Sequence, residues 1–318
     1  EELPYYQVAD GKKLSLTLTK KLEEYNESFA KMHLVLFDQA MEHICRVSRI
    51  IDTPRGNALL VGVGGSGKQS LTRLAAFISS MQVFQLKLTA SYGMADFKAD
   101  MITLYQGSGV KGQSIVFLFT DQQIVSEHML VYFNDLLSSG YIPDLYNADD
   151  KDNIINAVRP EVKAAGLMDS RDNCWNFFID RVRKNLHVVM CMSPVGDAMR
   201  NRCRKFPALT SCVSIDWFHA WPREALISVA QRFLEDVDLD PGDKENVAHH
   251  MAFVHESVEA CTKAYLAQER RNVYTTPKSY LELIQLYKRL LSQNTEKVVS
   301  MKERLETGLI KLRSSAAQ

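Results

Sequence analysis

The chain has 318 residues, with 38 lysines and arginines against 38 aspartates and glutamates, and 46% of its residues are hydrophobic. This composition predicts a soluble globular protein of about two domains, and it excludes the disordered and fibrous classes. A formal net charge of zero gives no general attraction to nucleic acid or to membrane lipid, so we expect neither as a partner and expect any phosphate to be held by a local site.

Residues 1–55 form a predicted N-terminal lead-in. After a polar start to about Leu18, apolar residues recur at near-helical spacing and predict one helix over residues 20–51. Pro54 and Gly56 are expected to end this helix, because neither residue favours its continuation.

From residue 56 to residue 219, short apolar runs alternate with longer amphipathic stretches. This alternation is typical of strands and helices in a mostly parallel sheet. The predicted fold class is therefore α/β, with five strands near residues 58–61, 83–88, 115–119, 187–192 and 212–215.

Strand patterns are absent after residue 219, and residues 220–277 are predicted to form a small all-α domain with helices over residues 223–234 and 245–270. A last helix is expected to begin at Pro277, because proline suits a first helical turn. Over residues 278–318 one set of positions repeats every seven residues: Ile284, Leu291, Val298, Leu305 and Leu312. This seam favours an antiparallel coiled coil with a missing partner strand, and a surface helix with one apolar stripe is the alternative.

A glycine-rich loop follows the first predicted strand and precedes an amphipathic helix: Gly62, Val63, Gly64, Gly65, Ser66, Gly67 and Lys68. This context is typical of a phosphate loop, in which backbone N–H groups and a helix N-terminus face an anion and the lysine reaches the β- and γ-phosphates. The same residues fit a dinucleotide fingerprint, which requires an acidic residue about 20 positions later. No acidic residue occurs between the loop and Asp96, so the phosphate loop is favoured over the dinucleotide fingerprint.

The residue after the loop lysine is normally a Ser or Thr whose hydroxyl coordinates Mg²⁺. Here that residue is Gln69, with Ser70 one position later. A carboxamide oxygen can ligate Mg²⁺ directly or through water. We therefore expect phosphate binding to persist, with Gln69 as an altered metal contact.

Two further polar sites follow predicted strands. Asp121 follows the apolar run at residues 115–119, as in a Walker B segment, and is expected to hold Mg²⁺, with a helix cap as its alternative role. The next residue, Gln122, can orient water but cannot accept its proton, which predicts slow or absent hydrolysis. Ser193 follows the fourth strand and is a candidate contact for the water and the γ-phosphate, although a turn-forming Ser-Pro pair explains it nearly as well.

Basic residues suggest contacts beyond the loop. Arg200, Arg202 and Arg204 precede the last predicted strand, where they are either solvated charge or an arginine finger for a neighbouring subunit's γ-phosphate. Lys278, at the start of the last helix, is the preferred candidate for a phosphate contact from the helical domain, ahead of Arg223.

The apolar runs are far shorter than the roughly 20 residues of a membrane helix, and the polar N-terminus does not resemble a signal peptide. The six cysteines include no Cys-x-x-Cys pair and are expected to be reduced thiols in a cytoplasmic setting: Cys45, Cys174, Cys191, Cys203, Cys212 and Cys261.

Taken together, several segments resemble the dynein heavy chains, and more narrowly the fourth AAA+ module of an axonemal dynein. The segments are residues 54–74, 117–121, 134–140, 202–207, 215–218 and 276–281. The resemblance implies a large α/β nucleotide-binding subdomain over residues 56–219, a small helical subdomain over residues 220–277 and the start of the stalk coiled coil over residues 278–318. It also implies ATP or ADP with Mg²⁺ as the ligand.

The same resemblance implies a regulatory module in the motor of a ciliary or flagellar axoneme. Its expected partners are neighbouring AAA+ modules of the same heavy chain, the second stalk helix, dynein accessory chains and, through a stalk tip outside this chain, the microtubule. Arg202 or Arg204 would complete the site of the third module. Two alternatives stay open: a competent ATPase with another base such as Glu127, and a mechanical adaptor with a vestigial pocket.

Overall fold

The computed structural model describes residue 8 and residues 10–32 and 34–316. The chain divides into two compact units, with the boundary between His219 and Ala220. Three parts of the predicted lead-in, residues 1–7, 9 and 33, and the last two residues of the predicted final helix, 317–318, lie outside the described residues.

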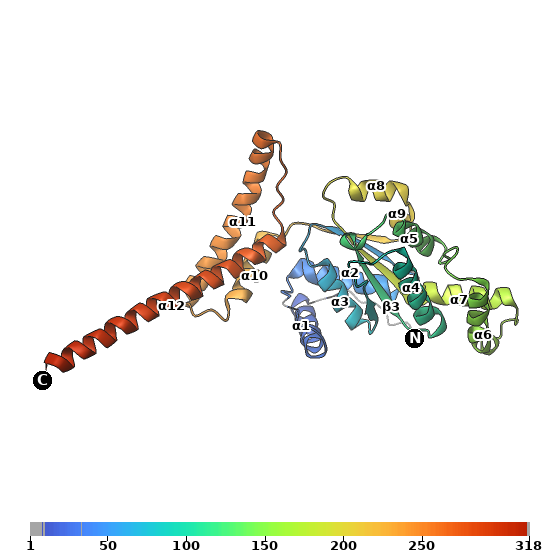
Figure 1. Ribbon diagram of the computed structural model, residues 1–318, viewed down its shortest axis with the longest axis horizontal. Coiled ribbons are helices and arrows are strands. Elements are labelled where there is room, and N and C mark those ends of the chain that lie inside the picture. Colours follow the sequence, from blue (N-terminus) through green and yellow to red (C-terminus); the bar gives the residue numbers. More distant parts are fainter. Residues whose placement is uncertain (1–7, 9, 33, 317–318) are drawn as a thin grey trace. The chain divides into compact units, whose positions relative to one another are not determined.

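The first unit is built on a five-stranded sheet in which all paired strands are parallel, so the predicted α/β class is confirmed (Figure 1). The strand order is β2-β3-β4-β1-β5. Because β1 lies between β4 and β5, the loop that follows it lies beside the ends of two other strands. The strands are β1 (Ala58–Gly62), β2 (Gln82–Phe84), β3 (Ile115–Thr120), β4 (Leu186–Met192) and β5 (Ser214–Phe218).

Helices cover both faces of this sheet. Along β1, Leu59 and Val61 belong to one hydrophobic core, and Ala58 and Leu60 belong to the other. A strand buried on both faces must be apolar at every position, which explains the uninterrupted hydrophobic run. The helices of this unit are α1 (Gly11–Ser28), α2 (Asp38–Asp52), α3 (Lys68–Ile78), α4 (Met94–Tyr105), α5 (Met129–Ser138), α6 (Ala148–Ala164), α7 (Arg171–Asn185), α8 (Ala198–Lys205) and α9 (Ala208–Ser211), with short turns η1 (Gln106–Val110) and η2 (Asp121–Gln123).

The predicted single helix over residues 20–51 is wrong, because the structure has two helices, α1 and α2. The first begins earlier than expected, at Gly11, where the Asp10 side chain accepts a hydrogen bond from the Lys12 amide. In the last turn of α1, the side chain of Asn26 accepts a hydrogen bond of 2.7 Å from the amide of Met32, which lies beyond the helix, and this bond fixes the turn. Both helices bury apolar residues against the same core, so the periodicity could not reveal the break.

Two predicted strands have different bounds in the structure. β2 ends at Phe84 and not at residue 88, because its ladder with β3 ends at the Phe84–Phe117 pair. β5 begins two residues later than expected and continues to Phe218. The buried carboxylate of Asp216 interrupts the apolar pattern of this strand, which explains why its second half was not predicted.

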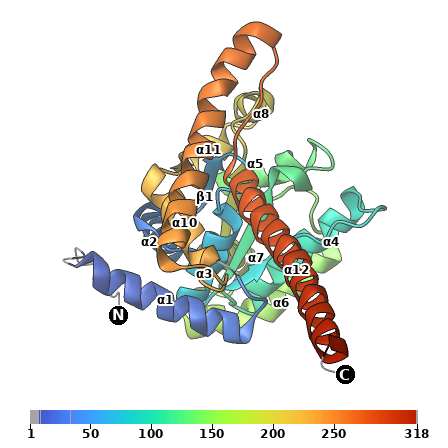
Figure 2. The same ribbon diagram turned by 90° about the vertical axis from the view of Figure 1, so that its left-hand side faces the viewer.

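The second unit is helical, as the fold class predicts, and consists of α10 (Arg223–Leu234), α11 (Pro241–Glu269) and α12 (Pro277–Ala316). α11 begins four residues earlier than the predicted helix over residues 245–270, at Pro241, where a proline suits the first turn. The hydroxyl of Tyr280 donates a hydrogen bond of 2.8 Å to the carbonyl of Leu226, which ties α12 to α10. Lys288 adds an ion pair of 2.7 Å with Asp236. Farther along, α12 continues as one unbroken helix past α10 and α11 (Figures 1 and 2).

None of the described helices is both long enough and apolar enough to cross a membrane.

Candidate functional site

The loop between β1 and α3 has the backbone of a phosphate-binding turn. Gly65 and Gly67 have φ angles of +81° and +90°, a region that side chains rarely tolerate and glycine enters freely. Gly67 directly precedes α3, which begins at Lys68. The loop therefore ends at a helix N-terminus, where free N–H groups and the helix dipole favour an anion.

Lys68 is held inside this loop. Its ammonium donates hydrogen bonds to the carbonyls of Gly62 (2.6 Å) and Val63 (2.9 Å) and to the hydroxyl of Ser66 (3.1 Å). Burial lowers the pKa of Lys68, and the neighbouring carboxylate of Asp121 opposes this shift. The lysine is thus positioned by the same loop that presents the backbone amides.

The loop opens into a cavity of about 440 Å³, within the range that small-molecule sites occupy. It brings together most of the residues that the sequence singles out: Gly62, Gly64, Gly65, Ser66, Gly67, Lys68, Gln69, Ser70, Asp121, Gln122 and Ser193. Val63 does not line the cavity and contributes its carbonyl to Lys68. Thr120, Cys191 and Met192 also line the cavity and were not predicted from the sequence. All three end β3 or β4, so their position at a strand terminus was the available signal.

Asp121 joins the ends of two strands. Its Oδ2 accepts a hydrogen bond of 3.1 Å from the backbone amide of Ser193. This bond fixes the carboxylate at the edge of the cavity, where a hard oxygen ligand suits Mg²⁺. The hydroxyl of Ser193 accepts a weak bond of 3.4 Å from the Val195 amide, so Ser193 acts in the local turn as well as lining the cavity.

The two glutamines after Asp121 have opposite environments. Gln122 is exposed and lines the cavity. Gln123 is buried, accepts a hydrogen bond of 2.9 Å from the Thr120 amide and donates one of 2.8 Å to the carbonyl of Leu86. Among the described residues that line the cavity, Asp121 provides the one carboxylate. The described part of the chain therefore places no second carboxylate at the cavity to serve as a general base.

Glu127, the alternative base, does not line the cavity. Its carboxylate forms an ion pair of 2.7 Å with Lys205. The hydrogen bond from Lys205 lowers the pKa of Glu127. A carboxylate with this pairing is a poor proton acceptor.

Cys191 is a buried thiol at the end of β4. Burial raises its pKa to about 12, which outweighs the opposing effect of Lys68. A neutral thiol contributes shape to the cavity and is a weak nucleophile.

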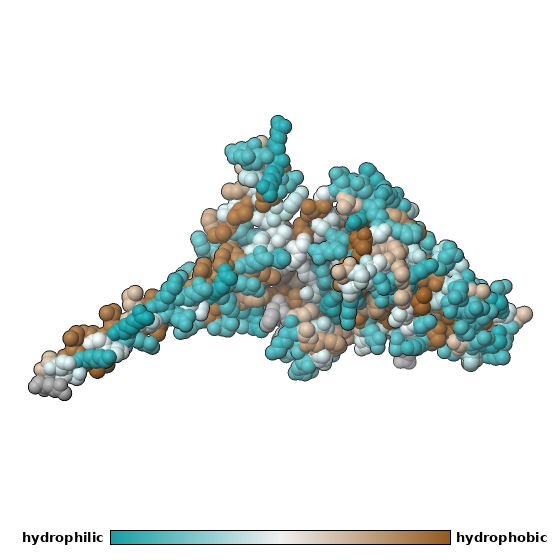
Figure 3. Space-filling model, in the orientation of Figure 1, coloured by the Kyte–Doolittle hydropathy of each residue, from teal (hydrophilic) through white to brown (hydrophobic). Residues whose placement is uncertain are grey.

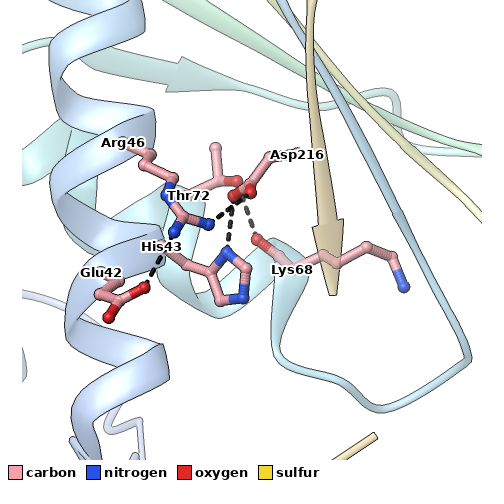
Figure 4. A network of polar contacts seen from close by, with 6 residues as sticks. All are labelled: Glu42, His43, Arg46, Lys68, Thr72 and Asp216. Carbon is pink, nitrogen blue, oxygen red and sulfur yellow. Dashed lines mark hydrogen bonds and ion pairs between the residues drawn. The ribbon is translucent and has the colours of Figure 1, made fainter. Parts of the chain in front are cut away.

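A polar network lies between α2 and β5, beside the first turns of α3 (Figure 4). His43 of α2 places Nδ1 at 2.6 Å from Oδ2 of Asp216, and the Arg46 guanidinium donates to Oδ1 at 3.2 Å. The His43 ring stacks on Phe218 with centroids 3.8 Å apart. Phe218 is the register partner of Gly62, and a Cβ at Gly62 would lie 2.7 Å from that of Phe218. The network thus fixes the position of β5 against α2. The last residue of β5, Phe218, in turn packs against Gly62 at the start of the loop.

Of the predicted basic contacts, Arg202 and Arg204 do not line the cavity, and Lys278 belongs to the second unit. Arg202 is half-buried on α8, and its buried Nε has no hydrogen-bond partner within the described part of the chain. Arg204 is exposed on the same helix. Lys278 is exposed at the start of α12 and lies 3.8 Å from the carboxylate of Glu282. The roles predicted for these three residues therefore stay predictions.

Residues 32–290 match the family model described as the P-loop containing dynein motor region D4. The chain belongs to the dynein heavy chain family. It is 56% identical over 320 residues to the flagellar outer arm dynein beta chain of Chlamydomonas reinhardtii, and 55% identical over 315 residues to the ciliary dynein beta chain of Tripneustes gratilla. Dynein axonemal heavy chain 9 of Homo sapiens is 53% identical over 318 residues. These matches cover 99–100% of this chain, which spans about 7% of the length of each relative.

The part that matches the dynein motor region includes the glycine-rich loop, Asp121, Ser193 and the first turns of α12. Membership in this P-loop family implies nucleotide binding. The geometry of the loop and cavity supports the same conclusion independently.

Proposed function

We propose that this chain is a regulatory nucleotide-binding module of an axonemal dynein heavy chain, the fourth AAA+ module of the ring. In this proposal it binds ATP or ADP with Mg²⁺, hydrolyses it slowly or not at all, and acts in a ciliary or flagellar axoneme. Residues 56–219 are its large subdomain, residues 220–277 its small subdomain and residues 278–318 the start of the stalk.

The observation that carries the proposal is the cavity formed by the loop, Lys68 and Asp121. Backbone amides and an ammonium group face a space of about 440 Å³, which suits a polyphosphate tail. An open cavity of this kind also argues against a vestigial pocket. Mg²⁺, when bound, supplies further charge neutralisation for the phosphates.

Slow hydrolysis follows from the residues beside Asp121. The residue that follows Asp121 at the cavity is Gln122, whose side chain is an amide and not a carboxylate. The absence of a general base typically lowers the rate by a factor of about 10² to 10⁴. The ion pair between Glu127 and Lys205 disfavours the competent-ATPase alternative.

The partners in this proposal follow from the dynein family. The ring neighbours are other AAA+ modules of the same heavy chain, and α12 pairs with the second stalk helix and connects the ring to the microtubule through the stalk tip. Arg202 or Arg204 serves the site of the third module, and Lys278 contacts phosphate when the helical subdomain closes. Dynein accessory chains complete the assembly.

Nucleotide binding tests the first part of the proposal. Lys68→Ala is expected to weaken ADP binding, measured by calorimetry, by about 10- to 100-fold, because it removes a charged hydrogen-bond donor. Lys111→Ala, an exposed lysine outside the cavity, is the matched control. Equal affinities for the two variants would refute the assignment of the loop.

Turnover tests the second part. Phosphate release by the wild-type chain is expected to stay near background, and Gln122→Glu is expected to raise it, because a carboxylate can accept the proton of the attacking water. Asp121→Asn added to that variant should remove the gain. Steady, metal-dependent turnover by the wild-type chain would contradict the regulatory role.

A further inference from the structure

Gln69 occupies the position at which phosphate loops normally carry the metal-binding hydroxyl. Its side chain lines the cavity, and its Oε1 accepts a hydrogen bond of 3.4 Å from Nε2 of Gln85. The Oε1 of Gln85 in turn accepts a hydrogen bond from the guanidinium of Arg73. The side chains of Arg73, Gln85 and Gln69 therefore form a row of hydrogen bonds, each donating to the next, that ends at the cavity.

Arg73 fixes which group donates and which accepts in this row of hydrogen bonds. A guanidinium group has donors and no acceptor, so Gln85 must present its oxygen to Arg73 and its NH₂ group to Gln69. If Gln69 turned its oxygen toward the cavity, two NH₂ groups would face each other. If Gln85 turned as well, its NH₂ group would face the guanidinium.

The three side chains come from elements with defined positions. Gln69 and Arg73 are four residues apart on α3 and so lie on the same face of that helix. Gln85 directly follows β2, the strand beside β3 at the edge of the sheet. Arg73 and Gln85 are both half-buried, which limits their freedom to rearrange. Within the described residues, Nε2 of Gln69 has no hydrogen-bond partner and is available to a ligand.

We infer that Gln69 donates its NH₂ group to an oxygen of the bound phosphate tail and does not ligate Mg²⁺. This inference rests on the proposed nucleotide function and replaces the metal role that the sequence suggests for Gln69. Asp121 stays available to a metal shell, so the metal is not excluded. The site instead holds its nucleotide with an affinity that depends little on Mg²⁺, because a direct hydrogen bond to the charged phosphate oxygen replaces part of the stabilisation that the metal would provide.

The test compares the affinity for ADP in Mg²⁺ and in EDTA, measured by calorimetry on the whole chain. For the wild type we expect a change of less than about threefold, whereas Gln69→Thr, which restores a metal-binding hydroxyl, should bind at least about tenfold more tightly with Mg²⁺ than without it. Gln69 is exposed, so this change is expected to leave folding intact, and thermal melting verifies that. Equal metal dependence in the two proteins overturns the inference.

Arg73→Met tests whether the direction of the hydrogen bonds from Arg73 through Gln85 to Gln69 matters, because this variant keeps both glutamines and removes only the guanidinium. Without the guanidinium, both amides can turn over and offer the Gln69 oxygen to the metal, so the metal dependence should rise toward that of Gln69→Thr. An unchanged metal dependence contradicts the inference. Ser70→Ala provides the converse control: if Ser70 held the metal, the wild type would depend on Mg²⁺ and this variant would lose that dependence.

The outcomes distinguish this inference from the proposed function. If the wild type binds ADP no better than Lys68→Ala, the nucleotide function fails, and the role of Gln69 fails with it. If Lys68→Ala loses binding while the wild type and Gln69→Thr respond equally to Mg²⁺, nucleotide binding stands and the role of Gln69 alone fails.

Discussion

At the residue scale, Gln122 and Gln123 show how identical neighbouring side chains take different roles. Gln123 is buried and joins the end of β3 to the segment after β2 through Thr120 and Leu86. Gln122 is exposed at the cavity. The difference arises because η2 turns one side chain inward and leaves the other facing the ligand space.

We predict that Gln123→Leu lowers the free energy of unfolding by about 1–3 kcal/mol, because the change leaves a buried amide and a buried carbonyl without partners. Gln122→Leu should change it by no more than about 0.5 kcal/mol, since the site is exposed. Urea unfolding of both variants measures the difference. Comparable losses in the two would mean that Gln123 does not hold the strand ends together.

Part of the site was predictable from the sequence because its chemistry follows strand ends directly. Asp121 and Ser193 lie just after apolar runs, and Lys68 ends the glycine-rich loop that follows another such run. Parallel strands bring these positions to one edge of the sheet. Gln85 and Arg73 were not predictable partners of Gln69. Their contact depends on how α3 packs beside the edge of the sheet, which no local pattern encodes.

At the element scale, the network around Asp216 connects α2 to β5. The carboxylate of Asp216 pairs with the side chains of His43 and Arg46, and Arg46 also forms an ion pair of 2.8 Å with Glu42. Burial raises the pKa of Asp216, but the hydrogen bonds and charges of His43 and Arg46 outweigh it, so the pKa lies below its usual range. The ionised form therefore stabilises the folded state.

A group with a lowered pKa contributes stability above its unfolded pKa, about 3.9 for aspartate, and loses that contribution as the pH falls through the folded value. Asp216→Asn is accordingly predicted to cost about 1–3 kcal/mol at pH 7, because hydrogen bonds to a buried charge are lost. The cost should shrink below about pH 4.

Denaturant unfolding of the wild type and Asp216→Asn at several pH values measures this difference. Asp180→Asn, which removes the partner of Arg55 in an exposed ion pair, should cost less than about 1 kcal/mol at every pH. A cost for Asp216→Asn that stays constant down to pH 3 would contradict the assigned role of the carboxylate.

Elements buried on both faces were predictable, and elements with polar interruptions were not. β3 and β4 are buried along their whole length and are apolar except for Thr120 at the end of β3 and His187 near the start of β4. Each differs from its predicted bounds by one residue at one end. The break between α1 and α2 depends on the side chain of Asn26 contacting Met32, and the end of β5 depends on an internal carboxylate. Both features are set by tertiary partners, which hydrophobic periodicity does not report.

At the scale of the whole molecule, the heptad row of α12 changes its environment along the helix. Ile284 is fully buried in the segment that packs on α10, between Tyr280 and Lys288. Val298, Leu305 and Leu312 have exposed fractions of 67%, 64% and 69%. Figure 3 shows hydrophobic residues on the surface of this helix toward its C-terminal end. One seam thus serves the core of the second unit first and is then available to a second helix.

This change of environment predicts that one substitution has effects of very different size at two positions of the row. Ile284→Glu should destabilise the second unit by more than about 3 kcal/mol, because it places a charge in an apolar site. Leu305→Glu should change the stability of this chain by no more than about 0.5 kcal/mol, because the side chain is already in water. Hydrogen exchange of α10 and α11 measures both effects.

In a longer heavy chain that includes the second stalk helix, Leu305→Glu should instead weaken the coiled coil and increase exchange along α12. If Leu305→Glu destabilised this chain as much as Ile284→Glu does, the row would already be covered by the chain itself, and the proposed stalk partner would have no surface to occupy.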